Sequence, residues 1–234
     1  MICAIPPAVA LAAIHTGRAV PYTRPGSCSA IAKVPVSGPV RIHAEGIEGD
    51  EQGDRRVHGG PEKAIHHYPF DHYAFWRQGH PHPLLAASGA FGENFSSTGW
   101  SEDTIHLADV IRVGTATLQV SQGRQPCWKL NDRFGLPDMA RSMQSSGRTG
   151  WYYRVLEGGR VAPGDAMTVV ERLCPDWSLR RLGHVLFDRT LERSVLEEAS
   201  QLPLTESWKK LLSNRLQRNE VESWQSRLQG PETR

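Results

Sequence analysis

Cysteine is scarce in this sequence, and the few cysteines stand far apart. Four occur among the 234 residues, and no two form a Cys-x-x-Cys pair: Cys3, Cys28, Cys127 and Cys174. This spacing gives no support to a zinc ribbon, a redox dithiol or a dense disulfide framework. It indicates a protein of a reducing compartment, where thiols stay free.

Long apolar runs are also missing. No stretch approaches the roughly 18 apolar residues of a membrane span. The first residues, MICAIPPAVALAAIHTG, are apolar, but they lack a basic start and are interrupted by Pro6 and Pro7, unlike a secretory signal. The sequence therefore predicts a cytoplasmic protein with no membrane partner.

An excess of one charge is absent as well. The formal net charge is +2, from 27 basic and 25 acidic residues, which is too small to indicate nucleic-acid or membrane binding. Basic residues gather late in the chain, but glutamates interleave with them, as on a solvated helical face. We expect no nucleic-acid partner. The sequence also has no dinucleotide-binding glycine fingerprint and no cysteine set for an iron–sulfur cluster.

Many short strands, punctuated by glycine and proline, are predicted up to residue 172. The candidates are Val9–His15, Ala30–Val36, Val40–Ala44, Thr104–Val113, Thr115–Ser121, Trp151–Leu156 and Met167–Arg172. Gly114 between two of them predicts a tight hairpin. Helical patterns in this part are confined to Asp71–Arg77 and Leu136–Ser145. Many strands with few helices favour a barrel or sandwich over a doubly wound sheet.

The pattern becomes helical after Arg172. Apolar residues recur at helical spacing in three segments, the first capped by Asp176 and the third begun by Pro203. We expect a β domain over residues 9–172 and a three-helix domain over residues 176–228.

Cys127 is the principal candidate for chemistry. It follows the alternating strand Thr115–Ser121 within QGRQPCWKLN, directly after Pro126 and three residues after Arg124. A soft sulfur beside an arginine, on a turn stiffened by proline, suits a metal-bearing cofactor that carries a phosphate. A lone cysteine is, however, more often a small packed apolar residue, and both readings stay open at this point.

A second candidate segment is GDEQGDRRVHGGPEKAIHHYP, residues 49–69. Gly59 and Gly60 could turn their amides toward an anion, with His58 before them and Lys63 after. On spacing alone, a plain turn joining two elements is the favoured interpretation of the glycines. His66 and His67 are adjacent, so on a strand they face opposite sides and cannot form a metal pair on one face.

Two further clusters carry polar residues on glycine turns. In FGENF, Glu93 and Asn94 can cross-link loops through hydrogen bonds to backbone groups, so a structural role is as plausible as a catalytic one. In GRTGWYYRVLEGGRVAPGD, Arg148 stands on a loop before an aromatic strand.

The order of these motifs carries more information than any one of them. GDEQ, then VHGG with P-E-K-A, then FGEN, then R-x-P-C-W-K-L-N, then G-W-Y-x-R-V with a final G-D, closely resembles the MOSC family. A C-terminal three-helix extension makes it similar to the bacterial YiiM-type branch. The resemblance implies a mainly β fold with helices: a MOSC β-barrel, similar to the pyruvate kinase barrel, followed by a small three-helix appendage.

The resemblance also implies an activity. Cys127 would ligate the molybdenum of a pterin-type molybdenum cofactor, and the protein would reduce N-hydroxylated purine bases such as 6-hydroxylaminopurine, a detoxification. The cofactor-binding residues are expected to be Gly59, Gly60, Lys63, Asn94, Arg124 and Arg148. Lysine and arginine suit the phosphate of such a cofactor.

Reduction of an N–OH group consumes protons and electrons. His58 is the first candidate for the general acid, followed by His66 or His67 and then by Asp50 or Glu93. A separate flavin-containing protein is expected to donate the electrons, and a homodimer is compatible with the helical extension. Two alternatives remain: a non-catalytic carrier of the molybdenum cofactor or its sulfur, and a barrel in which Cys127 is merely packed and another anion binds.

Overall fold

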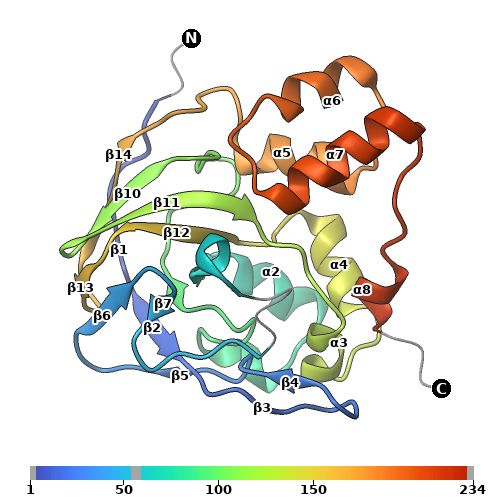
Figure 1. The fold of residues 1–234 in the computed structure, drawn as a ribbon. Coiled ribbons are helices and arrows are strands. Elements are labelled where there is room, and N and C mark those ends of the chain that lie inside the picture. Colours follow the sequence, from blue (N-terminus) through green and yellow to red (C-terminus); the bar gives the residue numbers. More distant parts are fainter. Residues whose placement is uncertain (1–3, 54–58, 231–234) are drawn as a thin grey trace.

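The computed structural model describes residues 4–53 and 59–230 (Figure 1). Within them, one nine-stranded sheet has the order β1-β14-β10-β11-β12-β8-β9-β2-β5, antiparallel except between β8 and β9. In chain order its strands are β1 (Val9–Ala10), β2 (Ala13–Thr16), β5 (Val34–Pro35), β8 (Ile65–His67), β9 (Phe95–Ser96), β10 (Val110–Val113), β11 (Ala116–Gly123), β12 (Trp151–Glu157) and β14 (Ala166–Glu171).

The sheet is curled into a half-barrel. β1 is at one end of its order and β2 is next to the other end, yet Leu11 and Ala12 alone separate them in the chain. Since the three Cα steps from Ala10 to Ala13 span roughly 11 Å at most, the two ends of the sheet must approach each other. The interior holds a large apolar cluster that includes Leu118, Trp151 and Tyr153. The predicted barrel-type fold is confirmed.

The β10–β11 hairpin follows the sequence pattern closely. Val113 pairs with Ala116, so Gly114 and Thr115 form a two-residue turn, and Gly114 has a φ of 53°. Ala116, Leu118 and Val120 of β11 are buried with no exposed surface. The predicted hairpin and the predicted inward face of this strand are both confirmed.

Small sheets and helices surround the half-barrel in the described part of the chain. A three-stranded sheet has the order β13 (Gly159–Val161), β6 (Val40–His43) and β7 (Gly46–Ile47), and β3 (Val20–Pro21) pairs with β4 (Cys28–Ser29). The helices before residue 172 are η1 (Pro61–Lys63), α2 (His72–Gly79), η2 (Pro83–Ala86), α3 (Lys129–Phe134) and α4 (Met139–Ser146). α2, α3 and α4 share a second apolar cluster that includes Tyr73, Leu130 and Met143.

The C-terminal part is helical, as predicted. Its helices are α5 (Leu179–Phe187), α6 (Arg193–Ser200), α7 (Glu206–Arg218) and α8 (Gln225–Gln229). α5, α6 and α7 share a third cluster with Leu107 and Ala108 of the segment before β10. α8 lies apart from them, beside α3 and α4 (Figure 1), and its Leu228 joins the second cluster. None of the described helices is long and apolar enough to cross a membrane.

Several predicted boundaries were wrong for identifiable reasons. The expected strand Val9–His15 is divided because its first part pairs with β14 and its second with β9. Thr104–Val113 is extended only from Val110, because residues 101–109 form turns in which the Asp109 carboxylate accepts from the His106 amide at 2.9 Å. Ala30–Val36 is extended only at β5.

The helix starts also differ from the predictions. Ser178, not Asp176, caps α5, because its hydroxyl accepts from the Arg181 amide at 3.1 Å. α7 begins at Glu206, three residues after Pro203. The helix α3, directly after Cys127, had no counterpart among the predicted elements.

Candidate functional site

A cleft opens beside the carboxyl end of β11, where the chain turns into α3. Its volume is about 590 Å³, including the space at its open mouth. The lining comes from β4 and the segment after it, the segment after β7, η1, β8, the turn before β9, both sides of the β11–α3 turn, and β12. The lining residues are Ser29, Ala30, Ile31, Lys33, Asp50, Glu51, Gln52, Gly53, Lys63, His66, Phe91, Gly92, Asn94, Arg124, Cys127, Lys129 and Tyr152.

Cys127 lines this cleft and is 8% exposed. Before it, the Arg124 amide donates to the Gly150 carbonyl at 3.0 Å, which continues the β11–β12 pairing past the end of the strand. After it, the Leu130 amide donates to the Cys127 carbonyl at 3.0 Å. Because both flanks are bonded and Pro126 restricts the backbone, the fold itself fixes the position of the thiol.

The surroundings of Cys127 differ from those of a packed thiol. None of the three apolar clusters formed by the described residues includes it, whereas Cys174 belongs to the helical one. Cys127 instead shares its cleft with charged side chains. The interpretation of Cys127 as an apolar filler stays untested, and this setting does not favour it.

Arg124 is a buried cation of the cleft, only 6% exposed. Its guanidinium is hydrogen-bonded to the Tyr152 hydroxyl, and its Nη1 lies 3.9 Å from the Met143 sulfur. Burial raises the pKa of Tyr152, so this hydroxyl stays protonated at neutral pH. Arg124 thus presents a fixed positive charge in the cleft that holds Cys127.

Three lysines also line the cleft, and the charge of one of them, Lys33, is balanced by a carboxylate. Burial lowers the pKa of Lys63, and the nearby Cys127 opposes that shift. Burial also lowers the pKa of Lys33, which forms an ion pair with Asp50. Lys129 donates to the Cys28 carbonyl at 2.6 Å. The positive charges of Arg124 and Lys63 favour an anionic ligand.

The motif analysis found only some of these cations. Lys63 and Arg124 were predicted, and the structure places both in the cleft with Cys127. Lys33 and Lys129 were missed. Lys129 belongs to the string PCWKLN and could have been found there, whereas no local pattern distinguishes Lys33 from an ordinary surface lysine.

Asn94 lines the cleft and also joins three parts of the fold. Its Oδ1 accepts from the His66 amide at 3.0 Å, and its Nδ2 donates to the His15 carbonyl at 3.1 Å and to Asp50 Oδ2 at 2.8 Å. The neighbouring Glu93 is completely buried and accepts from the Tyr73 hydroxyl and from loop amides. The cross-linking role expected of the FGEN motif is confirmed, while a contact between Asn94 and a cofactor stays a prediction.

His66 and His67 face opposite sides of β8, as predicted. His66 lines the cleft. His67 lies in the interior, where its ring stacks on Trp151 at 4.5 Å and bonds to the Tyr153 hydroxyl at 3.1 Å. Burial lowers the pKa of His67 to about 3, and burial together with the Arg124 charge keeps the pKa of His66 well below 6.5. Both imidazoles are neutral at pH 7.

Gly59 and Gly60 belong to the turn before η1 rather than to the lining of the cleft. Gly60 has a φ of 86°, its amide donates to Gln52 Oε1 at 3.2 Å, and its carbonyl accepts from the Lys63 amide at 3.0 Å. This turn brings Lys63 to the cleft. His58 lies outside the described residues.

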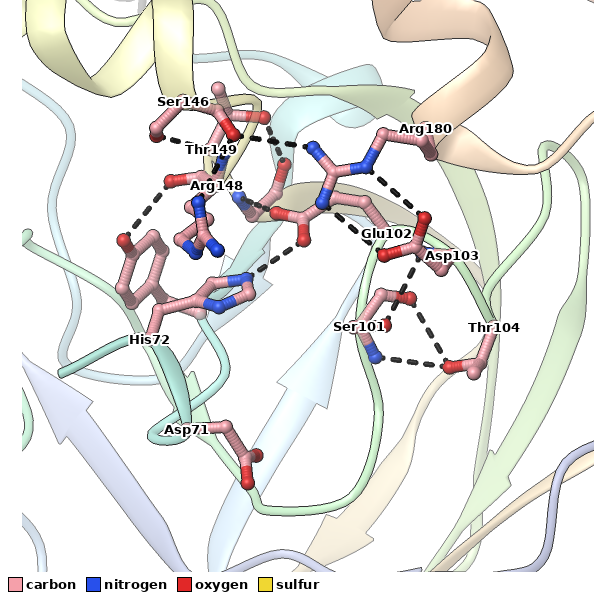
Figure 2. Close-up of polar contacts among 12 residues, drawn as sticks. Asp71, His72, Ser101, Glu102, Asp103, Thr104, Ser146, Arg148, Thr149 and Arg180 are labelled. Atoms are coloured by element: carbon pink, nitrogen blue, oxygen red, sulfur yellow. Dashed lines mark hydrogen bonds and ion pairs between the residues drawn. The ribbon is translucent and has the colours of Figure 1, made fainter. Parts of the chain in front are cut away.

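Arg148 does not line the cleft. Its guanidinium lies 4.1 Å from the centre of the Phe75 ring, and its carbonyl accepts from the Tyr68 hydroxyl at 3.0 Å. Figure 2 shows Arg148 in a different polar cluster, near His72 and Glu102. Its role in cofactor binding therefore stays a prediction that this placement does not favour.

That polar cluster contains residues that motif reasoning missed. The Glu102 carboxylate is hydrogen-bonded to His72 Nε2 at 2.8 Å (Figure 2). It also accepts from the Gly150 amide at 2.7 Å. The Gly150 carbonyl in turn receives the Arg124 amide. The buried Glu102 carboxylate thus fixes the backbone of Gly150, and the backbone of Arg124 is hydrogen-bonded to Gly150. A single acidic residue in a turn gives no sequence signal for this role.

The chain is similar to known proteins in both sequence and fold. Residues 54–168 match the MOSC domain, and residues 177–219 match the YiiM-like, 3-alpha helix domain. Protein YiiM of Escherichia coli (strain K12) is 36% identical over 222 residues, which cover 93% of this chain and 97% of that protein. Its crystal structure superposes with a TM-score of 0.80 at 29% identity, covering 95% of this chain and 99% of the other.

A longer relative comes from a fungus. A protein of Gibberella moniliformis (strain M3125 / FGSC 7600) named "Reductase" is 38% identical over 190 residues, which cover 80% of this chain but only 34% of that protein. With the coverage by the bacterial relative and the two domain matches in sequence order, the chain belongs to the MOSC family, in the branch that carries the YiiM-like three-helix domain.

Proposed function

We propose that this protein is a molybdenum-cofactor-dependent reductase of N-hydroxylated compounds, with N-hydroxylated purine bases such as 6-hydroxylaminopurine as its substrate class. The observation that carries the proposal is a cysteine, Cys127, that shares a cleft with a buried arginine, Arg124, and a half-buried lysine, Lys63. Membership of the MOSC family and the fungal relative named "Reductase" support a molybdenum-related oxidoreductase at a coarser level.

The residues of the cleft suit such a cofactor. A thiolate is a soft ligand appropriate to a molybdenum–dithiolene centre, and Cys127 would provide it. Arg124, Lys63 and Lys129 would hold the cofactor phosphate, Arg124 through its planar fork. When bound, the cofactor supplies two-electron chemistry at its metal.

The overall reaction is balanced by two electrons and two protons: R–NHOH becomes R–NH₂ and water. A general acid of the chain must supply protons, and His58 stays the first candidate. Among the other predicted acids, His66 and Asp50 line the cleft, and Asp50 is paired with Lys33. His67 and Glu93 do not line it. His66 lines it but is neutral at pH 7, because burial and the Arg124 charge hold its pKa well below 6.5, so it is a weaker candidate than His58.

The electrons are expected from a separate flavin-containing protein. The sequence contains neither a dinucleotide-binding glycine fingerprint nor the cysteines of an iron–sulfur cluster. The fungal "Reductase" matches this chain over only 34% of its own length, so most of that longer protein lies outside the shared region.

The test is turnover by protein produced in a molybdenum-replete host. A panel of N-hydroxylated bases and other N-oxygenated compounds is offered with a chemical electron donor such as reduced methyl viologen, and amine formation is measured. We expect reduction of the N-hydroxylated bases. We expect Cys127→Ser to lower the rate by at least about 100-fold, since the metal loses its protein ligand.

Cys174→Ser is the matched control, because it removes another largely buried thiol at a distance from the cleft. It should retain the wild-type rate. Full activity in Cys127→Ser would contradict the proposal. Molybdenum-loaded protein that reduces no member of the panel would favour the carrier alternative instead.

A further inference from the structure

The chain continues past α7, the third helix of the helical part, and forms a further short helix, α8. After α7 it returns to the half-barrel as a segment, residues 220–230, that we call the C-terminal strap (Figure 1). The strap includes α8 and lies beyond residues 177–219, which match the YiiM-like, 3-alpha helix domain. Its position beside α3 and α4 brings it to the turn that carries Cys127.

Arg227 of the strap is bonded directly to that turn. Its Nη1 donates to the Pro126 carbonyl at 2.5 Å, and its Nη2 donates to Gln144 Oε1 of α4 at 2.6 Å. The Arg227 carbonyl also accepts from the Trp128 amide at 2.8 Å. One residue of the strap therefore holds the backbone on both sides of Cys127.

The strap itself is anchored at both ends. At its start, Glu222 accepts two bonds from the buried Arg215 of α7, at 2.7 and 2.9 Å. At its end, the Leu228 carbonyl accepts from Asn131 Nδ2 at 2.8 Å and the Gln229 carbonyl accepts from Arg24 Nη1 at 2.7 Å. These anchors make Arg227 part of a fixed frame rather than a loose surface arginine.

The charge of Arg227 is maintained under ordinary conditions. Burial lowers its pKa to about 10, and the nearby Cys127 and Glu222 oppose that shift. The guanidinium is thus protonated at neutral pH and can donate both of its hydrogen bonds, to the Pro126 carbonyl and to Gln144. Hydrogen bonds from a charged donor are stronger than those between neutral groups.

We propose that Arg227 is a positioning residue for Cys127: through the Pro126 carbonyl and the Trp128 amide, the C-terminal strap fixes the turn that presents the thiol to the cleft. The inference rests on the proposed function in so far as Cys127 is the metal ligand. Arg227 does not line the cleft and acts through the backbone alone.

The experiment measures exposure of Cys127 in full-length protein without cofactor. The rate of Cys127 alkylation by iodoacetamide at a fixed pH of about 7 is followed by residue-specific mass spectrometry. Loss of a positive charge alone would slow alkylation, because it disfavours the thiolate. We expect Arg227→Met to react at least about 5-fold faster, because the released turn opens locally, and Arg227→Lys to lie between this variant and the wild type.

Arg218→Met is the control, since Arg218 is an exposed arginine at the end of α7; it should alkylate at the wild-type rate. Equal or slower alkylation of Arg227→Met would overturn the inference. If Arg227→Met does not fold, as judged by thermal melting, Arg227→Lys decides, and a rate equal to that of the wild type would overturn the inference.

A second readout is molybdenum retained per chain after loading under equal conditions. It should fall at least about 5-fold in Arg227→Met, because shifting the support of a ligand costs about 10- to 100-fold in metal affinity, and it should be unchanged in Arg218→Met. Absence of molybdenum from the wild-type protein would refute the proposed function while the alkylation result still tests the strap.

Discussion

At the scale of single residues, the candidate site depends on side chains that do not reach the cleft. Glu102 is 2% exposed, and its carboxylate is shared between the His72 ring and the Gly150 amide. Burial acts to raise the pKa of Glu102, but these hydrogen bonds and the charge of His72 outweigh it, so the pKa lies below its ordinary value of 4.5.

This lowered pKa predicts a pH-dependent loss of stability in Glu102→Gln. A carboxyl with a depressed pKa stabilises the fold above its unfolded value and loses that contribution as the pH falls through the folded value. We expect Glu102→Gln to lower the free energy of unfolding by about 1–3 kcal/mol at neutral pH. The difference from wild type should shrink below about pH 4.

Urea denaturation at several pH values between about 3.5 and 7 measures this difference. A deficit that is constant over the whole range would contradict the account, because it would mean that the ionised form of Glu102 has no special role. A deficit that grows toward low pH would contradict it as well.

Residues with local motifs were predictable, and residues defined by long-range contacts were not. Cys127, Arg124 and Lys63 were found from the strings around them, and the structure brings all three to one cleft. Lys33 and Glu102 were missed, because their importance arises from partners 17 and 48 positions away, Asp50 and Gly150. No short pattern in the sequence encodes such pairs.

At the scale of elements, the β10–β11 hairpin sets the direction of the strand that leads to Cys127. Gly114 has a φ of 53°, and a Cβ there would lie 2.3 Å from the Arg160 carbonyl oxygen. We expect Gly114→Ala to lower the free energy of unfolding by about 1–3 kcal/mol, because backbone strain and a clash with main-chain atoms both arise. Urea denaturation measures the change.

We expect Gly183→Ala to have the opposite effect on the free energy of unfolding. Gly183 lies inside α5, and an added Cβ would come no closer than 3.8 Å to another residue. Alanine should stabilise this helix by about 0.5–1 kcal/mol. Equal effects of the two substitutions would show that the conformation of Gly114 has no energetic consequence.

Elements with a strong local pattern were predicted well. The alternation in β11 and the helical spacing of α4 to α7 reflect burial of one face, which the sequence records directly. α3 was missed because it has only six residues and follows a proline turn. The division into β1 and β2 was missed because it depends on which distant strands pair with each part, and the curling of the sheet determines that pairing.

At the scale of the whole molecule, the helical part is packed against the half-barrel through a shared apolar cluster. Leu107, before β10, has no exposed surface, and its amide donates to the Trp177 carbonyl at 3.0 Å. Its side chain belongs to the same cluster as Trp208 of α7. This contact joins the two parts of the chain that the sequence pattern distinguished.

Leu107→Ala should therefore destabilise the molecule strongly. Loss of transfer free energy and the cavity left behind predict a decrease of about 2–5 kcal/mol in the free energy of unfolding. Leu156→Ala is the control, because Leu156 is 51% exposed and its truncation should cost within about 0.5 kcal/mol. Similar losses in the two variants, measured by urea denaturation, would contradict the packing described.

The most direct test of the central claim is the molybdenum and pterin content of protein purified from a molybdenum-replete host. The account predicts that the wild type and Cys174→Ser retain both and that Cys127→Ser loses most of its molybdenum while its thermal melting stays unchanged. Wild-type protein that contains neither molybdenum nor pterin, or a folded Cys127→Ser variant that retains molybdenum at the wild-type level, would contradict the account.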